Sequence, residues 1–143
     1  MTCEGERGER IWAAALALIG TRFRLHGRDV ASGLDCVGLA ALAVERAGLT
    51  PGPVPDRYAL RGTSEPALRE WLAAAQLEPV MTWATGDLLL DAPGAGQWHV
   101  MIGGRGEAGG RDAVIHAHAG LRRVVMMPGP PSGTLVGCWR VKG

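Results

Sequence analysis

The spacing of hydrophobic residues changes near Pro79, and this change most limits the folds open to the chain. Before Pro79, apolar side chains recur at the intervals typical of amphipathic helices. After it, they alternate or form short apolar runs separated by turns rich in glycine or proline, as in β-strands. Helices followed by an antiparallel meander predict an α+β fold, with the helices packed on one face of a sheet.

The sequence predicts three helices and five strands, joined by loops. The predicted helices cover Glu9–Ile19, the residues after Asp35 up to Gly48, and a segment that begins at Ser64 and Pro66. The predicted strands cover Asp87–Leu90, His99–Gly103, Ala113–Ala117, Arg123–Met127 and Leu135–Val141.

Composition narrows the class of protein. With 143 residues, 47% of them hydrophobic and 20% charged, the chain is expected to be one folded domain over residues 1–143. A net charge of +1 argues against a dedicated nucleic-acid binder. The apolar run Ile11–Gly20 is too short to span a bilayer, and acidic residues precede it where a signal peptide would be basic. We therefore expect a soluble chain made in the cytoplasm, with no membrane partner.

Cys36 is the cysteine whose position best suits chemistry. It follows Asp35, a helix-capping residue type, and so is expected in the first turn of a buried helix. The helix dipole and the unpaired N–H groups there favour a thiolate, the form that attacks carbonyl carbons. The alternative is a small buried hydrophobic residue, the usual role of a free cysteine. Sequence position alone leaves both open.

Two histidines fall on predicted neighbouring strands and can act on such a thiol. His99 could take the proton of the cysteine, and His116 could orient His99 through its other nitrogen. His118 lies two residues after His116, so both point to the same face of a strand. That spacing leaves two alternatives: His118 as the orienting residue, and a zinc site made of all three histidines.

Four blocks of the sequence resemble, in order and spacing, the NlpC-type cell-wall peptidases, which are papain-like cysteine peptidases. They are GTRFRLHGRDVASGLDCVGLAALAV (Gly20–Val44), GDLLL (Gly86–Leu90), HVMIGG (His99–Gly104) and VIHA (Val114–Ala117). The resemblance implies N-terminal helices packed on a bent antiparallel sheet of about five strands. It also implies a peptidase that needs no cofactor or metal and hydrolyses amide bonds in peptidoglycan stem peptides, often the bond between γ-D-glutamyl and a diamino acid.

Carried over block by block, the resemblance makes Cys36 the nucleophile, His99 the general base and His116 the third, polar member. Asp35 matches the acid that precedes the nucleophile, which the family uses in capping and substrate contact. Phe23 stands where the family usually has tyrosine, so it is expected at the substrate without a hydroxyl group.

Two further residues are expected to contact the substrate. Arg24, in the loop before Cys36, could bind a stem-peptide carboxylate, and Trp98 could form a wall of the cleft beside His99. The DCVG block, the short single domain and the missing export signal resemble the phage-tail and gene-transfer-agent branch of the family. That implies tail proteins as partners and action in the periplasm or cell wall on a particle. A structural tail-tip component with little or no activity is the alternative, ahead of a zinc hydrolase.

Overall fold

The computed structural model describes residues 4–52, 70–73, 77–94, 97–106, 110–130 and 135–142. The helices are α1 (Glu4–Ala17) and α2 (Cys36–Arg46). The strands are β1 (Arg28–Asp29), β2 (Gly33–Leu34), β3 (Leu77–Val80), β4 (Leu88–Gly94), β5 (Gln97–Arg105), β6 (Asp112–His118), β7 (Arg123–Pro128) and β8 (Leu135–Val141). No helix in these ranges is both long and apolar enough to cross a membrane.

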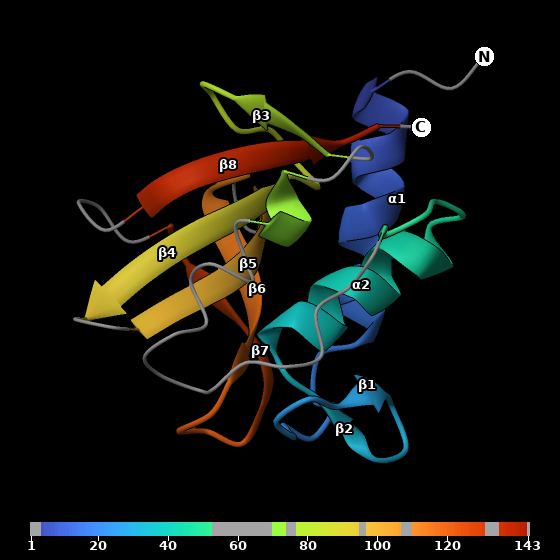
Figure 1. Ribbon diagram of the computed structural model, residues 1–143, viewed down its shortest axis with the longest axis vertical. Helices are drawn as coiled ribbons and strands as arrows, with labels where there is room; N and C mark the ends of the chain where they lie inside the picture. Colours follow the sequence, from blue (N-terminus) through green and yellow to red (C-terminus); the bar gives the residue numbers. More distant parts are fainter. Residues whose placement is uncertain are drawn as a thin grey trace.

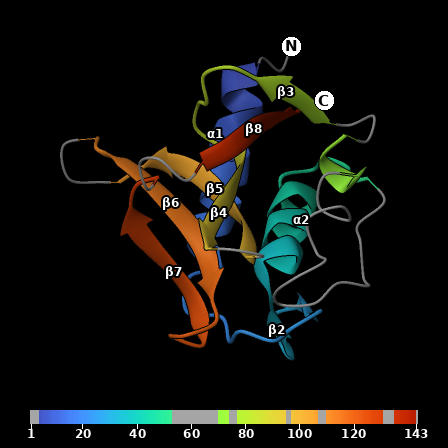
Figure 2. The same ribbon diagram turned by 60° about the vertical axis from the view of Figure 1, so that its left-hand side comes forward.

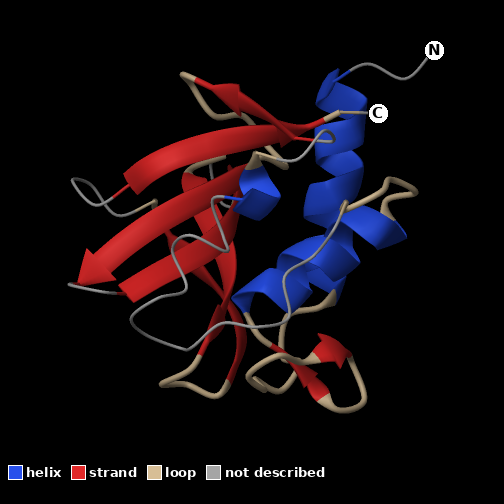
Figure 3. Ribbon diagram, viewed as in Figure 1, coloured by secondary structure: helices blue, strands red, loops and turns tan. Residues whose placement is uncertain are grey.

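Six strands form one antiparallel sheet in the order β3-β8-β4-β5-β6-β7, and β1 and β2 form a separate small hairpin. The strands change direction strongly from β8 and β4 to β6 and β7, so the sheet is bent (Figures 1 and 2). Both helices lie beside this sheet, and the β1–β2 hairpin lies next to the start of α2 (Figure 3). The predicted α+β fold, with N-terminal helices on a bent antiparallel sheet, is confirmed.

The main core lies between the helices and one face of the sheet. Ile11, Trp12 and Leu18 of α1 are buried there with Leu88 and Ile102 of the sheet. The approach of α1 is close: a Cβ atom added at Gly104 would lie 2.3 Å from the Trp12 ring. The opposite face of the sheet carries a smaller cluster made of Leu89, Met101, Val114 and Cys138. The fold therefore buries both faces of its central strands.

Several predicted boundaries need correction. The sheet has six strands rather than about five, because β3 was not predicted. Pro79 interrupts the strand pattern there, but β3 is an edge strand that pairs with β8 alone, and an edge tolerates proline. Helix α1 begins at Glu4 instead of Glu9, since acidic residues are favourable in a first helical turn. Most of the predicted third helix lies outside the described residues. In the part of it that the structure describes, residues 70–72 are helical.

Candidate active site

Asp35 fixes the start of α2. Its Oδ1 accepts hydrogen bonds from the Gly38 N–H at 2.8 Å and from the Arg28 guanidinium at 3.0 Å, and its Oδ2 accepts one from the His26 N–H at 2.8 Å. The loop residue Gly27 lies so close to the helix that a Cβ added at Gly38 would meet the Gly27 oxygen at 2.0 Å. Cap and loop together hold Cys36 at the first position of α2.

The Cys36 sulfur lies between the start of α2 and β5. The backbone N–H groups of Val100, Val37 and Cys36 itself all act on it and lower the pKa of its thiol. Burial raises that pKa more strongly, the negative charge of Asp35 raises it further, and the result is about 12. The expectation of a thiolate at rest is therefore wrong: burial outweighs the helix start, and the group is a neutral thiol.

His99 and His116 form a direct pair on adjacent strands. The Nε2 of His99 and the Nδ1 of His116 are 2.7 Å apart, and the two rings meet edge to face with centroids 4.8 Å apart. Val100, whose N–H acts on the Cys36 sulfur, directly follows His99 on β5. The structure thus brings the three predicted catalytic residues to one region, where His99 contacts His116 directly and Cys36 meets β5 through Val100.

Met127 determines which ring nitrogens carry protons. The Nε2 of His116 lies 3.3 Å from the Met127 sulfur, and a thioether sulfur can only accept a hydrogen bond. His116 therefore carries its proton on Nε2, so its Nδ1 accepts from the Nε2–H of His99. This leaves the Nδ1 of His99 as an unprotonated, basic nitrogen.

Both histidines are neutral at ordinary pH. Burial lowers the pKa of His99 to about 3, and the positive charges that His116 and His118 can carry lower it further. Burial also lowers the pKa of His116, and the charge that His118 can carry lowers it further. The negative charge of Asp91 raises it, and the result is about 4. A neutral thiol and a neutral imidazole are suited to general-base catalysis, in which the proton moves from sulfur to nitrogen as the sulfur attacks.

Asp91 is a site residue that the sequence analysis missed. It is 4% exposed, and it is paired in register with His99 across β4 and β5. The predicted strand stops at Leu90 and the predicted turn begins at Ala92, so the prediction gives Asp91 no role. The available signal was one acid placed directly after a run of three leucines that the structure buries completely.

The other predicted residues lie around this region with differing exposure. Asp35 is 2% exposed, and its carboxylate accepts hydrogen bonds within the protein, including the one that caps α2. Phe23 and Trp98 are partly buried against the main core, and Arg24 is exposed. His118 accepts a hydrogen bond from the Leu121 N–H through its Nδ1 at 3.0 Å, which ties it to a turn rather than to His99.

The zinc alternative finds no support in the part of the chain that the structure describes. No three histidine, cysteine, aspartate or glutamate side chains there are grouped as metal ligands would be. His116 uses both ring nitrogens within the protein, on His99 and on Met127.

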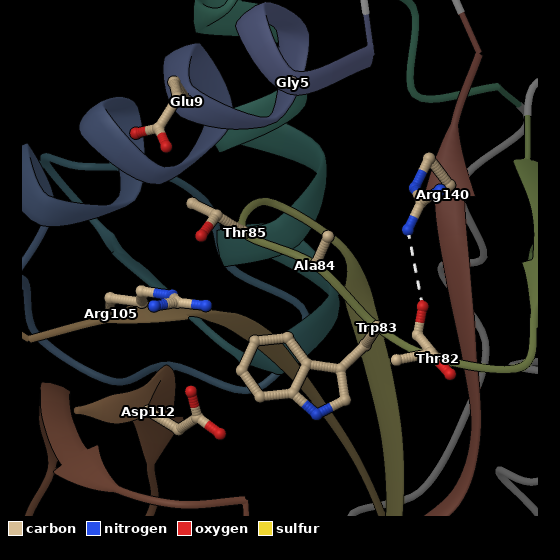
Figure 4. Close-up of a pocket in the computed structure, with 9 residues that line it drawn as sticks. All are labelled: Gly5, Glu9, Thr82, Trp83, Ala84, Thr85, Arg105, Asp112 and Arg140. Atoms are coloured by element: carbon tan, nitrogen blue, oxygen red, sulfur yellow. Dashed lines mark hydrogen bonds between the residues drawn. The ribbon is translucent and has the colours of Figure 1, made fainter. Parts of the chain in front are cut away.

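A cleft of about 480 Å³ lies elsewhere on the molecule (Figure 4). It opens between α1, the loop before β4 and the far ends of β5, β6 and β8, and its lining includes Trp83, Arg105 and Asp112. Arg105 is six residues along β5 from His99, a separation of roughly 20 Å. None of the residues predicted for the catalytic site lines this cleft.

Comparison with known proteins gives structural relatives only. No family model matches the sequence, and no curated protein matches it either. Among solved structures, the NlpC/p60 domain of the peptidoglycan hydrolase SagA is 27% identical, with a TM-score of 0.54, over 85% of this chain and 88% of that one.

Two mycobacterial structures are also similar. The P60 domain of an antigen from M. avium subspecies paratuberculosis is 19% identical, with a TM-score of 0.59, over 98% of each chain. The peptidoglycan hydrolase RipB from Mycobacterium tuberculosis is 21% identical, with a TM-score of 0.55, over 98% of this chain and 67% of that one. The chain therefore has an NlpC/P60-like fold, and its structural neighbours include peptidoglycan hydrolases.

Proposed function

We propose that the protein is a cysteine peptidase that hydrolyses amide bonds in the stem peptides of peptidoglycan. The observation that carries this proposal is the hydrogen bond of 2.7 Å between His99 and His116. His99 lies on β5, and the next residue on that strand, Val100, directs its N–H at the Cys36 sulfur. A cysteine at a capped helix start and a polarised imidazole on a neighbouring strand form the arrangement needed for nucleophilic acyl transfer. The likeness to the SagA domain adds support for the substrate class.

The reaction begins with a proton transfer. As the Cys36 sulfur attacks the amide carbonyl carbon, its S–H bond breaks and the proton passes to the Nδ1 of His99. The sulfur supplies the electron pair of the new S–C bond, and negative charge moves to the carbonyl oxygen. The Cys36 and Val37 N–H groups at the start of α2 have no partner within the helix and can donate to that oxygen.

Collapse of the tetrahedral intermediate completes the first half. The C–N bond breaks, His99 gives its proton to the leaving amine, and a thioester remains on Cys36. Water then attacks the thioester carbonyl carbon and gives one proton to His99. The C–S bond breaks, His99 returns that proton to the Cys36 sulfur, and the acyl half leaves as a free carboxylic acid that ionises in water. His116 keeps the ring of His99 oriented through both halves.

The test is digestion of purified peptidoglycan, followed by mass spectrometry of the muropeptides. Cys36→Ser should abolish the release of new amine and carboxylate ends, because serine is a far weaker nucleophile without a stronger base. Cys138→Ser is the matched control: that thiol is buried in β8 and donates to the Val80 carbonyl oxygen at 3.1 Å, a bond that serine can keep. Equal digestion by both variants, or none by the unmodified protein, would contradict the proposal.

The same spectra test a finer proposal. We infer from the resemblance of the sequence blocks that the bond cut joins γ-D-glutamyl to a diamino acid, and that the protein acts in the periplasm or cell wall while attached to a phage-like tail. Fragments ending in γ-D-glutamate would support the bond. Stable incorporation into particles together with digestion would support the location, whereas incorporation without digestion would favour a structural tail component.

A further inference from the structure

The Asp91 carboxylate is buried without a hydrogen-bonding partner. The side chain is 4% exposed, and its Oδ1 is fully buried and accepts no hydrogen bond. A carboxylate removed from water in this way destabilises the folded protein unless something nearby gains from its charge.

The strand geometry places Asp91 on the same sheet face as the histidines. It is paired in register with His99 across β4 and β5, so these two side chains leave the sheet on the same side. The pairing of β4 with β8 shifts between Leu90 and Asp91, where β8 holds the extra residue, and the pairing of β4 with β5 shifts after Asp91, where β4 holds it. The carboxylate is near enough to His116 for its charge to raise the pKa of that ring.

The remaining ionisable groups around the pair do not supply this negative charge. On β6, His118 adds a group that can become positive, and its register partner on β7 is Arg123. On α2, Cys36 is a neutral thiol, and the charge of the preceding Asp35 is bound by the Arg28 guanidinium. Among the residues that the structure describes, Asp91 is thus the negative group that acts on His116.

We propose that Asp91 is a positioning residue whose buried carboxylate stabilises a positive charge on the His99–His116 pair. The pair takes up this charge when Cys36 gives its proton to His99. The inference rests on the proposed function for its catalytic meaning, though its electrostatic part can be measured without peptidoglycan. The proton leaves the sulfur and binds the Nδ1 of His99, and the charge so formed is shared along the hydrogen bond to His116. Asp91 acts through His116 and touches no substrate.

The variant Asp91→Asn keeps the size of the side chain and removes its charge. Without the charge the pair becomes a weaker base, so proton transfer from Cys36 is harder. We expect alkylation of Cys36 by iodoacetamide at neutral pH, read by mapping the modified peptide, to slow by about tenfold, the effect of one pKa unit. A direct effect of Asp91 on the thiol has the opposite sign, because losing a negative charge makes a thiol more acidic. Unchanged or faster alkylation would therefore overturn the proposal.

Two further measurements separate this role from a structural one. Asp91→Asn should unfold at the same temperature as the unmodified protein or a higher one, because it replaces an unpartnered buried charge with a neutral group. Glu78→Gln removes an exposed charge from β3 of the same sheet and should leave alkylation unchanged. A clear loss of stability in Asp91→Asn, or equal slowing in Glu78→Gln, would contradict a charge effect specific to Asp91.

A measurement on the unmodified protein does not depend on the variant folding. The carboxyl ¹³C resonance of Asp91 should change at the pH where His116 takes up its proton, and a resonance indifferent to that step would overturn the proposal. The two proposals fail in different ways. If Cys36 is alkylated more slowly in Asp91→Asn but the unmodified protein digests no peptidoglycan, the role of Asp91 is supported and the proposed peptidase function is rejected. If Asp91→Asn is alkylated at the normal rate and digests peptidoglycan, the peptidase function is supported and the role of Asp91 is rejected.

Discussion

Replacing Asp35 by asparagine or by alanine separates two effects of this side chain on Cys36. Asp35 caps α2 through the Gly38 N–H, and its negative charge raises the pKa of the Cys36 thiol. Asparagine caps helices about as well as aspartate but carries no charge. Asp35→Asn should therefore keep α2 in place and lower the pKa of the thiol below its present value of about 12.

The size of the effect follows from the order of its causes. Burial raises the pKa of the thiol more than Asp35 does, so the larger of the two raising effects remains in the variant. Each unit of decrease raises the thiolate fraction at neutral pH by about tenfold. The alkylation rate of Cys36 by iodoacetamide should rise in proportion, opposite in direction to the slowing expected for Asp91→Asn.

Asp35→Ala removes the cap as well as the charge. The lost bond to the Gly38 N–H costs about 1 kcal/mol. The bonds from the Arg28 guanidinium and the His26 N–H add roughly 2–3 kcal/mol, with Arg28 discounted because its side chain is 32% exposed. The free energy of unfolding should fall by about 3–4 kcal/mol, and the melting temperature by roughly 10 °C for a chain of this length.

The assay is peptide-resolved alkylation together with thermal unfolding of all three proteins. The expected pattern is faster alkylation and a modest loss of stability in Asp35→Asn, and a large loss of stability in Asp35→Ala. If Asp35→Asn folds normally and its Cys36 is alkylated no faster, the charge of Asp35 does not hold the thiol neutral. If Asp35→Ala melts with the unmodified protein, the cap does not position the nucleophile.

Three further perturbations test other parts of the account. Met127→Leu removes the acceptor for the Nε2–H of His116, so a severalfold fall in kcat with little change in KM is expected in peptidoglycan digestion. His99 and His116 are neutral when folded, with pKa values of about 3 and 4 against an ordinary 6.5. Their contribution to stability is complete above pH 6.5 and is lost as the pH falls toward 4, so the melting temperature should fall across that interval. Gly104→Ala places a Cβ atom 2.3 Å from the Trp12 ring and should lower the free energy of unfolding by about 1–3 kcal/mol in denaturant titrations.

Each of these has a control within the chain. Met126→Leu changes an exposed neighbour of Met127 and should leave kcat unchanged. Gly5→Ala lies in α1 with nothing near its added Cβ, and should raise the free energy of unfolding by up to about 1 kcal/mol. Equal losses in both methionine variants, or equal effects of both glycine variants, would show that the contacts described do not decide the outcome.

The elements that sequence analysis predicted best are those with a strong local signal. The strand Leu135–Val141 has the predicted bounds, because a mostly apolar run follows a clear sequence signal for a turn, rich in proline and glycine. Helix α2 begins directly after its predicted cap, since an aspartate before an apolar run is a local signal. The β1–β2 hairpin and β3 were not predicted, because short or proline-containing strands depend on their pairing partners.

The electrostatics of the candidate site could not be obtained from local patterns. Proximity to a helix start predicted an acidic thiol at position 36, but burial by β5, distant in sequence, reverses the direction. The same limit applies to Asp91, whose environment is created by strand pairing and by the bulge in β4. The identities of His99 and His116 were accessible from sequence, whereas their tautomers depend on Met127, which pairs from another strand.

The proposed mechanism requires that Cys36 becomes acylated by a peptidoglycan stem peptide. Its most direct test is rapid acid quenching of the protein with a synthetic stem peptide, followed by mass spectrometry of the proteolysed enzyme. We expect a transient adduct on the peptide that contains Cys36. Its added mass should equal that of the carboxylic acid product less one water, and hydroxylamine should remove it. Turnover of the stem peptide with no adduct on Cys36, or with an adduct on Cys138 alone, would contradict it.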